Sequence, residues 1–355
     1  MVGVSLLTLV PGVLGGSETY SRELVRALAR VGRHEYVVFV PAIAPDAADG
    51  LPAKTVSSYR AGRTTGRRLA AIVSGSLRPG PLRRELQPER LQALHFPLTL
   101  MIPRIDRPAA ATTVLDLQHE LFPRFFSVAE LAFRRVFYRS AIRRSRLVIA
   151  ISEHVKQSLV ERLGLEPDRV RVARLGVDHQ RFSPGTVARQ PFVLYPANAW
   201  PHKNHRRLFE AFALVRAERP ELRLVLTGAG HEKLRLPDGV ESRGRVSADE
   251  LVELYRTASA LVFPSLYEGF GQPPLEAMAC GCPVAASRAG ALPEVCGDAA
   301  RLFDPTDVEE IAAATLAALA GKLVPRGIER ARLFSWDDCA RQHDDVYEEL
   351  ASLGR

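Results

Sequence analysis

The chain has 355 residues, of which 46% are hydrophobic and 25% are charged, and its formal net charge is +8. These fractions are ordinary for a globular protein, and no stretch supplies the roughly 20 apolar residues of a membrane-spanning helix. The length exceeds the roughly 250–300 residues at which a single hydrophobic core stops growing, so two domains are expected.

Basic residues gather in the first half of the chain. Residues 1–180 contain 27 Lys/Arg and 16 Asp/Glu, a net charge of +11, whereas residues 181–355 contain 21 and 24, a net charge of −3. The densest run, RRVFYRSAIRRSR, extends from Arg134 to Arg146. Such a surface favours anionic lipid headgroups or an acidic acceptor. The alternative, to which we give equal weight, is that these arginines lie on helix faces exposed to solvent and bind no partner. No aromatic stacking platform accompanies these bases, so a nucleic-acid partner is not expected.

Predicted strands and helices alternate along the chain. The N-terminal run MVGVSLLTLV lacks the charged start of a signal peptide and is predicted to be a strand. A helix is predicted from a Ser17 cap to Gly32, and another from Ser152 to Gly164. Further buried strands are predicted from short, β-branched runs bounded by turn signals, at residues 35–40, 112–116, 146–152, 192–197, 222–228, 259–265 and 283–287.

The second half continues this alternation. A helix is predicted over about residues 204–216, another begins at the capping box of Ser247 and Glu250, and one long helix ends the chain. Strand–helix alternation of this kind predicts an α/β fold of parallel sheets with helices on both faces.

One polar, Gly/Pro-containing stretch without periodicity, residues 174–191, interrupts the alternation and is predicted to be a linker. It divides the chain into a first domain, residues 1–176 with the last helix at 336–355, and a second domain, residues 177–335. Parallel α/β sheets bind ligands at the carboxyl ends of their strands. With two such domains, a site in the cleft between them is expected.

The four cysteines lie in the last quarter without the spacing of zinc ligands. They indicate packed thiols in a reducing compartment, at Cys280, Cys282, Cys296 and Cys339. A cytoplasmic location is therefore expected, and peripheral contact of the basic first domain with the inner membrane face stays open.

The stretch FPSLYEGFGQPPLEAMACGCPV places one carboxylate on each side of a glycine hinge. Gly269 and Gly271 allow backbone angles closed to other residues and leave room for a ligand. The prolines that follow are tolerated in the first turn of a helix, whose free N–H groups attract anions. Glu276, expected in that first turn, has the chemistry to bind a ribose diol, and Glu268 lies nearer the phosphates. A strand, turn and helix with solvated glutamates is the alternative.

Two more segments point to anion binding. Lys203 in YPANAWPHKNHRRL lies at a helix entrance, where an ammonium can neutralise a phosphate that gains charge as its bond breaks. The alternative is that Lys203 faces solvent at the start of the helix and binds no ligand. Near the amino terminus, Gly15 and Gly16 directly precede a helix and form a second candidate cradle for an anion or sugar.

Together, GGSETY, the lysine-asparagine helix start, TGAG, FPSLYEGFGQPPLEAMACGCPV and AGALPEVCGDAA resemble the retaining glycosyltransferases of family 4, which have two Rossmann-like domains (GT-B). Glu268 and Glu276 match the family's E-x7-E spacing. The resemblance covers nearly the whole chain and is specific in the second domain and loose in the first. It implies an acceptor-binding first domain and a nucleotide-sugar-binding second domain facing each other across a cleft, with the last helix crossing back to the first domain.

The resemblance also implies residue roles. Glu276 would hold the nucleotide ribose, Glu268 the donor sugar's hydroxyls, and Lys203 the leaving diphosphate, while Gly16 would close on that diphosphate from the first domain. The backbone of further residues would bind the sugar, the diphosphate and the base, at Gly269, Phe270, Gly271, Gln272, Arg245 and Val246.

The chain departs from the family pattern at two positions. Asn198 stands where the family usually has an arginine, five residues before the phosphate lysine, so neutralisation would rely on Lys203, helix termini and His202. Leu115 stands where a histidine usually precedes Asp116, and His119, three residues on, is a candidate for an acceptor-side or sugar-side role. A purely loop-shaping His119 is the alternative.

The function expected from this resemblance is transfer of a hexose, from UDP- or GDP-hexose first, to a hydroxyl of a glycan, lipid-linked or small-molecule acceptor with retention. The enzyme must stabilise charge on the leaving oxygen. No Asp-x-Asp cluster predicts a metal, and no cofactor is expected. An inactive nucleotide-sugar-binding partner subunit and a nucleotide-sugar epimerase remain alternatives. A nicotinamide dehydrogenase is disfavoured because TGAGHEK lacks the third glycine.

Overall fold

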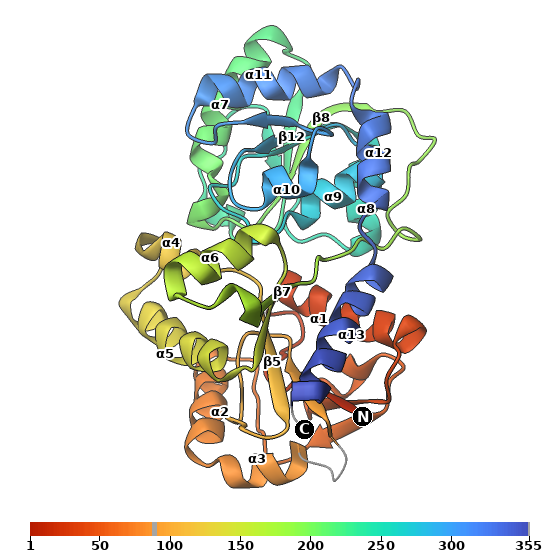
Figure 1. The fold of residues 1–355 in the computed structure, drawn as a ribbon. Coiled ribbons are helices and arrows are strands. Elements are labelled where there is room, and N and C mark those ends of the chain that lie inside the picture. Colours follow the sequence, from red (N-terminus) through yellow and green to blue (C-terminus); the bar gives the residue numbers. More distant parts are fainter. Residues whose placement is uncertain (87–90, 354–355) are drawn as a thin grey trace. The chain divides into compact units, whose positions relative to one another are not determined.

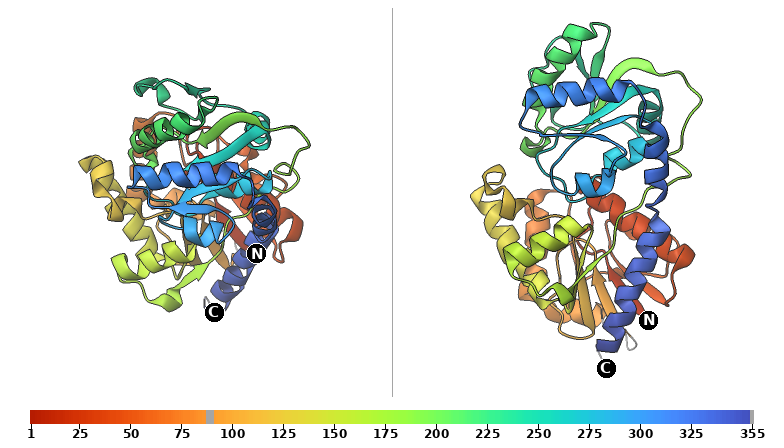
Figure 2. Two further views of the ribbon diagram at one scale, coloured as in Figure 1. Left: turned by 90° about the horizontal axis from the view of Figure 1, so that it is seen from above. Right: turned by 45° about the horizontal axis from the view of Figure 1, so that its top comes forward.

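The computed structural model describes residues 1–86 and 91–353. Contacts divide the chain into two units. Unit 1 is Met1–Gly176 together with the C-terminal segment that begins at Trp336, and unit 2 is Val177–Ser335. Figures 1 and 2 show that each unit is a sheet covered by helices.

Unit 1 contains a seven-stranded parallel sheet in the order β3-β2-β1-β4-β5-β6-β7. Its strands are β1 Val2–Ser5, β2 Tyr36–Pro41, β3 Ala53–Val56, β4 Ala93–Phe96, β5 Ala109–Val114, β6 Leu147–Ala150 and β7 Val170–Val172. The strand order reverses direction between β1 and β4, which are adjacent and parallel. In a sheet of this kind, that reversal opens a crevice at the carboxyl ends of the two strands.

The longer helices of unit 1 include the last helix of the chain. They are α1 Gly16–Val31, α2 Thr65–Leu77, α3 Pro79–Leu86, α5 Val128–Arg144, α6 Glu153–Leu163 and α13 Trp336–Leu353, with the short α4 at Gln118–Leu121. α13 packs on α1, β4 and β5, as Figure 1 shows. Buried hydrogen bonds join α13 to α1 and to the sheet. Tyr20 Oη on α1 lies 2.9 Å from both His343 Nε2 on α13 and Thr113 Oγ1 on β5. Tyr347 Oη on α13 lies 2.8 Å from His95 Nδ1 on β4.

Unit 2 contains a six-stranded parallel sheet in the order β10-β9-β8-β11-β12-β13. Its strands are β8 Gln190–Pro196, β9 Arg223–Thr227, β10 Val240–Ser242, β11 Ala258–Phe263, β12 Val284–Ser287 and β13 Arg301–Phe303. Its helices are α7 His205–Glu218, α8 Ala248–Thr257, α9 Gln272–Ala279, α10 Leu292–Cys296, α11 Val308–Leu319 and α12 Val324–Arg332. Here the order reverses between β8 and β11.

The predicted α/β class with parallel sheets is confirmed, and each predicted strand overlaps an observed one. The sequence missed β3, β4, β7, β10 and β13. These strands have only three or four residues, and the edge strands β3, β10 and β13 carry the sequences AKTV, VES and RLF, which lack a continuous apolar run. An edge strand has one neighbour and little need for a buried side-chain pattern.

The predicted Ser17 cap is wrong. α1 begins at Gly16, and Gly15 is its N-cap with φ 55° and ψ −128°, a conformation that in practice requires glycine. Ser17 is a residue of the first turn, and its carbonyl oxygen accepts a hydrogen bond from Ser21 Oγ at 2.9 Å. By contrast, the predicted Ser152 cap and Gly164 end of α6 are confirmed, with Gly164 left-handed at φ 65°.

No single helix within the described residues is long and apolar enough to cross a membrane. The pair α11 and α12 meets the length and composition test only together, with a 94° bend between them. Both helices pack inside unit 2, α11 on α7 and α12 on α9. All four cysteines are free and buried, as predicted for packed thiols, and burial raises the pKa of Cys296 to about 12.

Candidate functional site

Two charged side chains meet at the strand reversal of unit 2. Lys203 ends the short turn Pro201–Lys203 after β8, and Glu268 lies in the loop after β11, the parallel neighbour of β8. Lys203 Nζ lies 2.6 Å from Glu268 Oε1, and the two side chains are only 12% and 15% exposed. The ammonium also lies 5.1 Å from the centre of the Phe263 ring, a cation–π distance. The fold therefore joins two predicted site residues 65 positions apart.

The turn that carries Lys203 is anchored from both sides. Tyr195 Oη, on β8, donates a 2.5 Å hydrogen bond to the carbonyl oxygen of Lys203. Asn204, left-handed at φ 60°, donates from Nδ2 to the carbonyl oxygens of Pro264 at 3.1 Å and Pro305 at 2.7 Å. Asparagine tolerates this backbone better than most residues. These bonds hold Lys203 in place before any ligand binds.

The backbone of Glu268 is held by the segment AGALPEV. Ala291 N donates to the carbonyl oxygen of Glu268 at 3.0 Å. Gly290 has φ 59°, and a Cβ there would lie 2.3 Å from that same oxygen. Only glycine fits so close an approach, so the loop of Gly290 sets the position of Glu268.

The hinge between the two carboxylates leads directly into α9. Gly271 is the N-cap at φ 135°, and a Cβ there would lie 2.8 Å from Leu292 Cδ2. Pro273 and Pro274 lie in the first turn of the helix, as expected from the sequence. Pro273 and Pro274 have no N–H, and Leu275 N donates to the carbonyl oxygen of Gly271 at 3.2 Å, so the first turn itself has at most the N–H of Gln272 for an anion. The partial positive charge of the helix start still suits an anion.

The prediction that Glu276 lies in the first turn of α9 is wrong. α9 begins at Gln272, so Glu276 is its fifth residue and lies in the second turn. The carboxylate accepts a 3.0 Å hydrogen bond from Tyr255 Oη. Burial raises the pKa of Glu276 to about 7, while hydrogen bonds from Tyr255 and Gln272 oppose this rise. A carboxyl group that titrates near neutrality can both accept and donate hydrogen bonds there.

Asn198 braces two loops of unit 2. Its Oδ1 accepts a 2.7 Å hydrogen bond from the backbone N–H of Ala229, in the TGAG loop after β9. His231, a residue that the sequence motifs did not single out, lies 2.8 Å through Nε2 from the carbonyl oxygen of Ala197 and 2.8 Å through Nδ1 from Ser242 Oγ. Its place directly after TGAG was the available signal. Asn198 and His231 thus tie together the loops that follow β8, β9 and β10.

The remaining predicted residues of unit 2 lie at the same edge of the sheet. Arg245 is exposed and Val246 is half-buried, in the loop between β10 and α8. This loop is tied to the TGAG loop, because Gly228 N donates to the carbonyl oxygen of Gly244 at 2.7 Å. Phe270 is buried, and His202 is only 8% exposed.

The glycine pair of unit 1 follows β1 and opens α1. A Cβ on Gly15 or Gly16 would meet no atom within 4 Å. The left-handed φ of Gly15 explains why residue 15 is glycine. Packing does not require glycine at residue 16, and the approach of a ligand is one reason for a glycine there.

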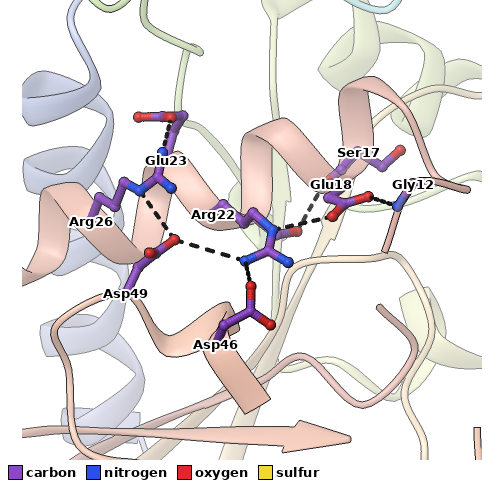
Figure 3. Close-up of polar contacts among 9 residues, drawn as sticks. Gly12, Ser17, Glu18, Arg22, Glu23, Arg26, Asp46 and Asp49 are labelled. Carbon is purple, nitrogen blue, oxygen red and sulfur yellow. Dashed lines mark hydrogen bonds and ion pairs between the residues drawn. The ribbon is translucent and has the colours of Figure 1, made fainter. Parts of the chain in front are cut away.

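A charged network fixes the start of α1 (Figure 3). Glu18 Oε2 accepts the N–H of Gly12 at 2.7 Å, and Glu18 Oε1 lies 3.1 Å from Arg22 Nε. Arg22 reaches Asp46 at 2.9 Å and Asp49 at 4.0 Å, in and beside the turn Pro45–Ala48 after β2. The network ties the loop before α1 to the neighbouring loop. The sequence offered only the GG-x-E pattern as its signal.

Asp116 and His119 follow β5 in unit 1. Asp116 Oδ1 accepts the N–H of Gln118 at 3.0 Å. His119 is 1% exposed and its Nε2 lies 3.5 Å from Glu120 Oε1, while its Nδ1 has no hydrogen-bond partner among the described residues. Burial lowers the pKa of His119, and nearby Arg134 lowers it further. A buried nitrogen without a hydrogen-bond partner is uncommon, and a functional role of His119 stays a prediction beside loop shaping.

The structure thus gathers the candidates into one set per unit, each at the carboxyl edge of its sheet. The predicted contact of Gly16 with a diphosphate held by unit 2 joins both units and stays a prediction. No group of three or more His, Cys, Asp or Glu residues within the described ranges could hold a metal ion. The expected metal-free chemistry also stays a prediction.

Comparison with known proteins places the chain in a family. Residues 177–333 match the family described as "Glycosyl transferases group 1", and residues 14–181 match "Glycosyltransferase Family 4". The O-antigen chain mannosyltransferase B of Escherichia coli is 31% identical over 283 residues, which cover 72% of this chain and 74% of that protein. The chain belongs to the group 1 glycosyltransferases of family 4.

Other relatives of this glycosyltransferase are also named as transferases. The MMP alpha-(1->4)-mannosyltransferase of Mycolicibacterium hassiacum is 32% identical over 279 residues, or 72% of this chain and 64% of that protein. A D-inositol 3-phosphate glycosyltransferase of Geodermatophilus obscurus is 34% identical over 246 residues, or 59% of this chain and 54% of that protein. These names favour a transferase over an epimerase.

Solved structures share the fold. Sucrose-phosphate synthase from Thermosynechococcus elongatus superimposes with a TM-score of 0.74 at 20% identity, covering 99% of both chains. Anabaena HepE in complex with UDP and glucose gives 0.71 at 17% identity, covering 98% of this chain and 99% of that one. The predicted GT-B fold class of this glycosyltransferase is confirmed.

Proposed function

We propose that this glycosyltransferase moves a hexose from a nucleoside diphosphate sugar to a hydroxyl group, with retention at the anomeric carbon. Mannose is the first candidate, because two of its relatives are named mannosyltransferases. A sugar hydroxyl of a growing glycan is the first candidate acceptor, because one relative is named for an O-antigen chain. GDP- and UDP-hexoses are the donors to test first.

The observation that carries this proposal is the meeting of Lys203 and Glu268 at the strand reversal of unit 2. As the bond between the anomeric carbon and the diphosphate oxygen breaks, negative charge grows on the leaving group. The Lys203 ammonium and the start of α9 are positive groups at the same sheet edge, and such preorganised charge is the strongest kind of catalytic help. The acceptor oxygen then bonds to the anomeric carbon, and its proton passes to the leaving diphosphate.

We assign Glu268 to positioning. Its carboxylate is ion-paired with Lys203, which reduces its strength as a nucleophile. A retaining glycosidase needs two carboxyl groups about 5–5.5 Å apart, one of them a free nucleophile. Glu268 instead has the chemistry to accept hydrogen bonds from donor-sugar hydroxyls and to stabilise a cationic sugar ring.

Glu276 is assigned to the ribose. A pKa of about 7 lets this carboxyl group accept from one ribose hydroxyl and, when protonated, donate to the other. Its second-turn position keeps it on α9, the helix whose first turn would face the diphosphate. One short helix would then serve two parts of the nucleotide.

A donor screen tests the proposal. We expect one nucleotide class among UDP-, GDP-, dTDP- and ADP-hexoses to raise the melting temperature, because a ligand that binds only the folded state stabilises it. With that donor, slow release of free hexose identifies a transferase, and a product that keeps the donor's anomeric configuration identifies retention. Interconversion of the donor sugar without transfer would instead favour an epimerase.

Lys203→Ala provides the test of mechanism. We expect kcat to fall by roughly 100- to 1,000-fold, as for loss of one group that stabilises the developing anion. Lys322→Ala removes an exposed lysine of the same unit and is the matched control. Equal turnover by both variants would contradict the assigned role of Lys203.

A further inference from the structure

Two helices of unit 1 expose apolar side chains to solvent. Among the described residues, eleven large hydrophobic side chains are exposed, and five of them lie on these two helices. They are Leu69 (40%), Val73 (40%) and Leu77 (76%) on α2, and Val128 (85%) and Val136 (57%) on α5. Single exposed hydrophobic residues are normal, but a concentration on neighbouring helices marks an interaction surface.

The exposed residues of α2 form one stripe. Leu69, Val73 and Leu77 are spaced four apart, so they lie on one face of the helix. Ala71 and Ile72 lie on the other face, buried in the core cluster of unit 1. A surface helix needs only one apolar face to fold. The exposed stripe of Leu69, Val73 and Leu77 is a second apolar face of α2, and it indicates contact with a partner.

α5 combines an apolar and a basic outer face. At about 100° per residue, Val128, Arg135, Val136 and Arg143 fall within an arc of roughly 100°, and all four are exposed. Phe137 points inward and packs against the same core cluster that includes residues of α2. Figure 1 and the right view of Figure 2 show α2 and α5 along one flank of unit 1. We call this surface the α2–α5 face.

A basic pocket lies at the end of α5. It has a volume of about 80 Å³ and is lined by Arg139, Ile142, Arg143, Arg162, Leu163 and Leu165. Arg139 is held by two hydrogen bonds to Glu120, at 2.9 and 3.0 Å. Arg143 and Arg162 have no carboxylate partner in the described part of the chain. Two guanidinium groups without a carboxylate partner, in a pocket also lined by Ile142, Leu163 and Leu165, suit a phosphate that is attached to an apolar body.

We propose that the α2–α5 face docks on an anionic lipid bilayer, with a headgroup phosphate in the Arg139–Arg143–Arg162 pocket. Unit 1, residues 1–176 and 336–355, contains 29 Lys/Arg and 21 Asp/Glu, and its net charge of +8 complements such a surface. An acidic macromolecule in water would use the arginines but would leave the Leu77 and Val128 side chains unexplained. A bilayer interface takes up both kinds of group. Docking would bring the enzyme to a lipid-linked acceptor, and in this respect the inference rests on the proposed function.

Vesicle cosedimentation tests the docking in the absence of donor and acceptor. We expect the full chain to pellet with vesicles of equal parts phosphatidylglycerol and phosphatidylcholine, and to stay in solution with phosphatidylcholine alone. The double variant Arg143→Gln/Arg162→Gln should bind about 25-fold more weakly, or about fivefold per arginine. Leu77→Ser/Val128→Ser should also weaken binding, and the effect should persist at high salt, where electrostatic attraction is screened.

The control is Arg235→Gln/Val187→Ser, which makes one change of each kind, one arginine and one apolar residue, at exposed positions of unit 2. It should bind vesicles like the unaltered chain, and melting temperatures should show that all variants fold. Release of the protein from vesicles by millimolar inorganic phosphate at constant ionic strength would assign the pocket to free phosphate and overturn the proposal. So would unchanged vesicle binding by the arginine variant, or self-association of the chain through Leu77 and Val128 in place of vesicle binding. Because no donor is present, failure here leaves the proposed transfer reaction untouched.

Discussion

Lys203 Nζ and Glu268 Oε1 form a 2.6 Å ion pair at the strand reversal of unit 2. A diphosphate that takes Lys203 as its partner must therefore compete with Glu268. The same carboxylate that we assign to the donor sugar should therefore weaken binding of the bare nucleotide.

Glu268→Gln is expected to separate these two effects. The neutral amide competes poorly for the ammonium, so affinity for the nucleoside diphosphate should rise about tenfold, while kcat should fall about 100-fold. Calorimetric titration and turnover with the selected donor provide the two measurements. Glu210→Gln, which removes a carboxylate paired with Arg206 on the surface of α7, should change neither. Weaker nucleotide binding by Glu268→Gln would show that the two groups do not compete.

Gly290→Ala is expected to be destabilising and to disturb the site. The new Cβ would lie 2.3 Å from the carbonyl oxygen of Glu268 and would also occupy a left-handed backbone. We expect a loss of about 3 kcal/mol in the free energy of unfolding, measured by urea denaturation. Gly321→Ala, with φ 68° but no atom within 4 Å of its Cβ, should lose only about 1 kcal/mol. Equal losses would show that the approach of Gly290 to Glu268 is not tight.

Glu276 should make stability depend on pH. Its pKa is raised from the ordinary 4.5 to about 7, so the folded protein holds this proton more tightly than the unfolded chain. The contribution is therefore unfavourable to folding once the unfolded chain ionises, and stability falls as pH rises from about 4.5 to about 7. Glu276→Gln should lack this fall, which is at most about 3 kcal/mol. Urea denaturation of both proteins at pH 5 and pH 8 measures it, and parallel changes would refute the raised pKa.

Tyr347→Phe should loosen α13 from unit 1. The change removes the hydroxyl that lies 2.8 Å from His95 Nδ1 and leaves a buried nitrogen unpaired. We expect a loss of about 2 kcal/mol in the free energy of unfolding. Tyr59→Phe, at a buried tyrosine without a hydrogen-bond partner among the described residues, is the control and should be nearly neutral. A stable Tyr347→Phe variant would show that this hydrogen bond contributes little to holding α13 on unit 1.

Gly16→Ala distinguishes folding from ligand approach. A Cβ at this position meets nothing within 4 Å, and alanine favours a helix more than glycine does, so stability should stay constant or rise by up to about 1 kcal/mol. If the donor diphosphate approaches this backbone, kcat/KM for the donor should still fall at least about tenfold, because one ill-placed atom disturbs the reacting geometry. Gly66→Ala in α2 is the control, since it too has open space. Unchanged kinetics would remove Gly16 from the donor site.

The sequence by itself determined the features that depend on neighbours along the chain. Runs such as FVLYPA and LRLVLTG predicted β8 and β9 because a buried parallel strand requires a short, continuous apolar run. Ser152 and Gly164 marked the two ends of α6, because a cap satisfies backbone groups of its own helix. In the second domain, local motifs and their resemblance to family 4 were enough to identify Lys203 and Glu268 as site residues.

Tertiary structure alone decided what depends on contacts between distant segments. The 2.6 Å pairing of Lys203 with Glu268 follows from β8 and β11 being neighbours, which no local pattern specifies. The same holds for the pKa of Glu276, which burial sets, and for the loops braced by Asn198 and His231. Sequence patterns record the rules of one strand or one helix, whereas a site at a sheet edge is built from several of them. Its distances and charges appear only when the strand order is known.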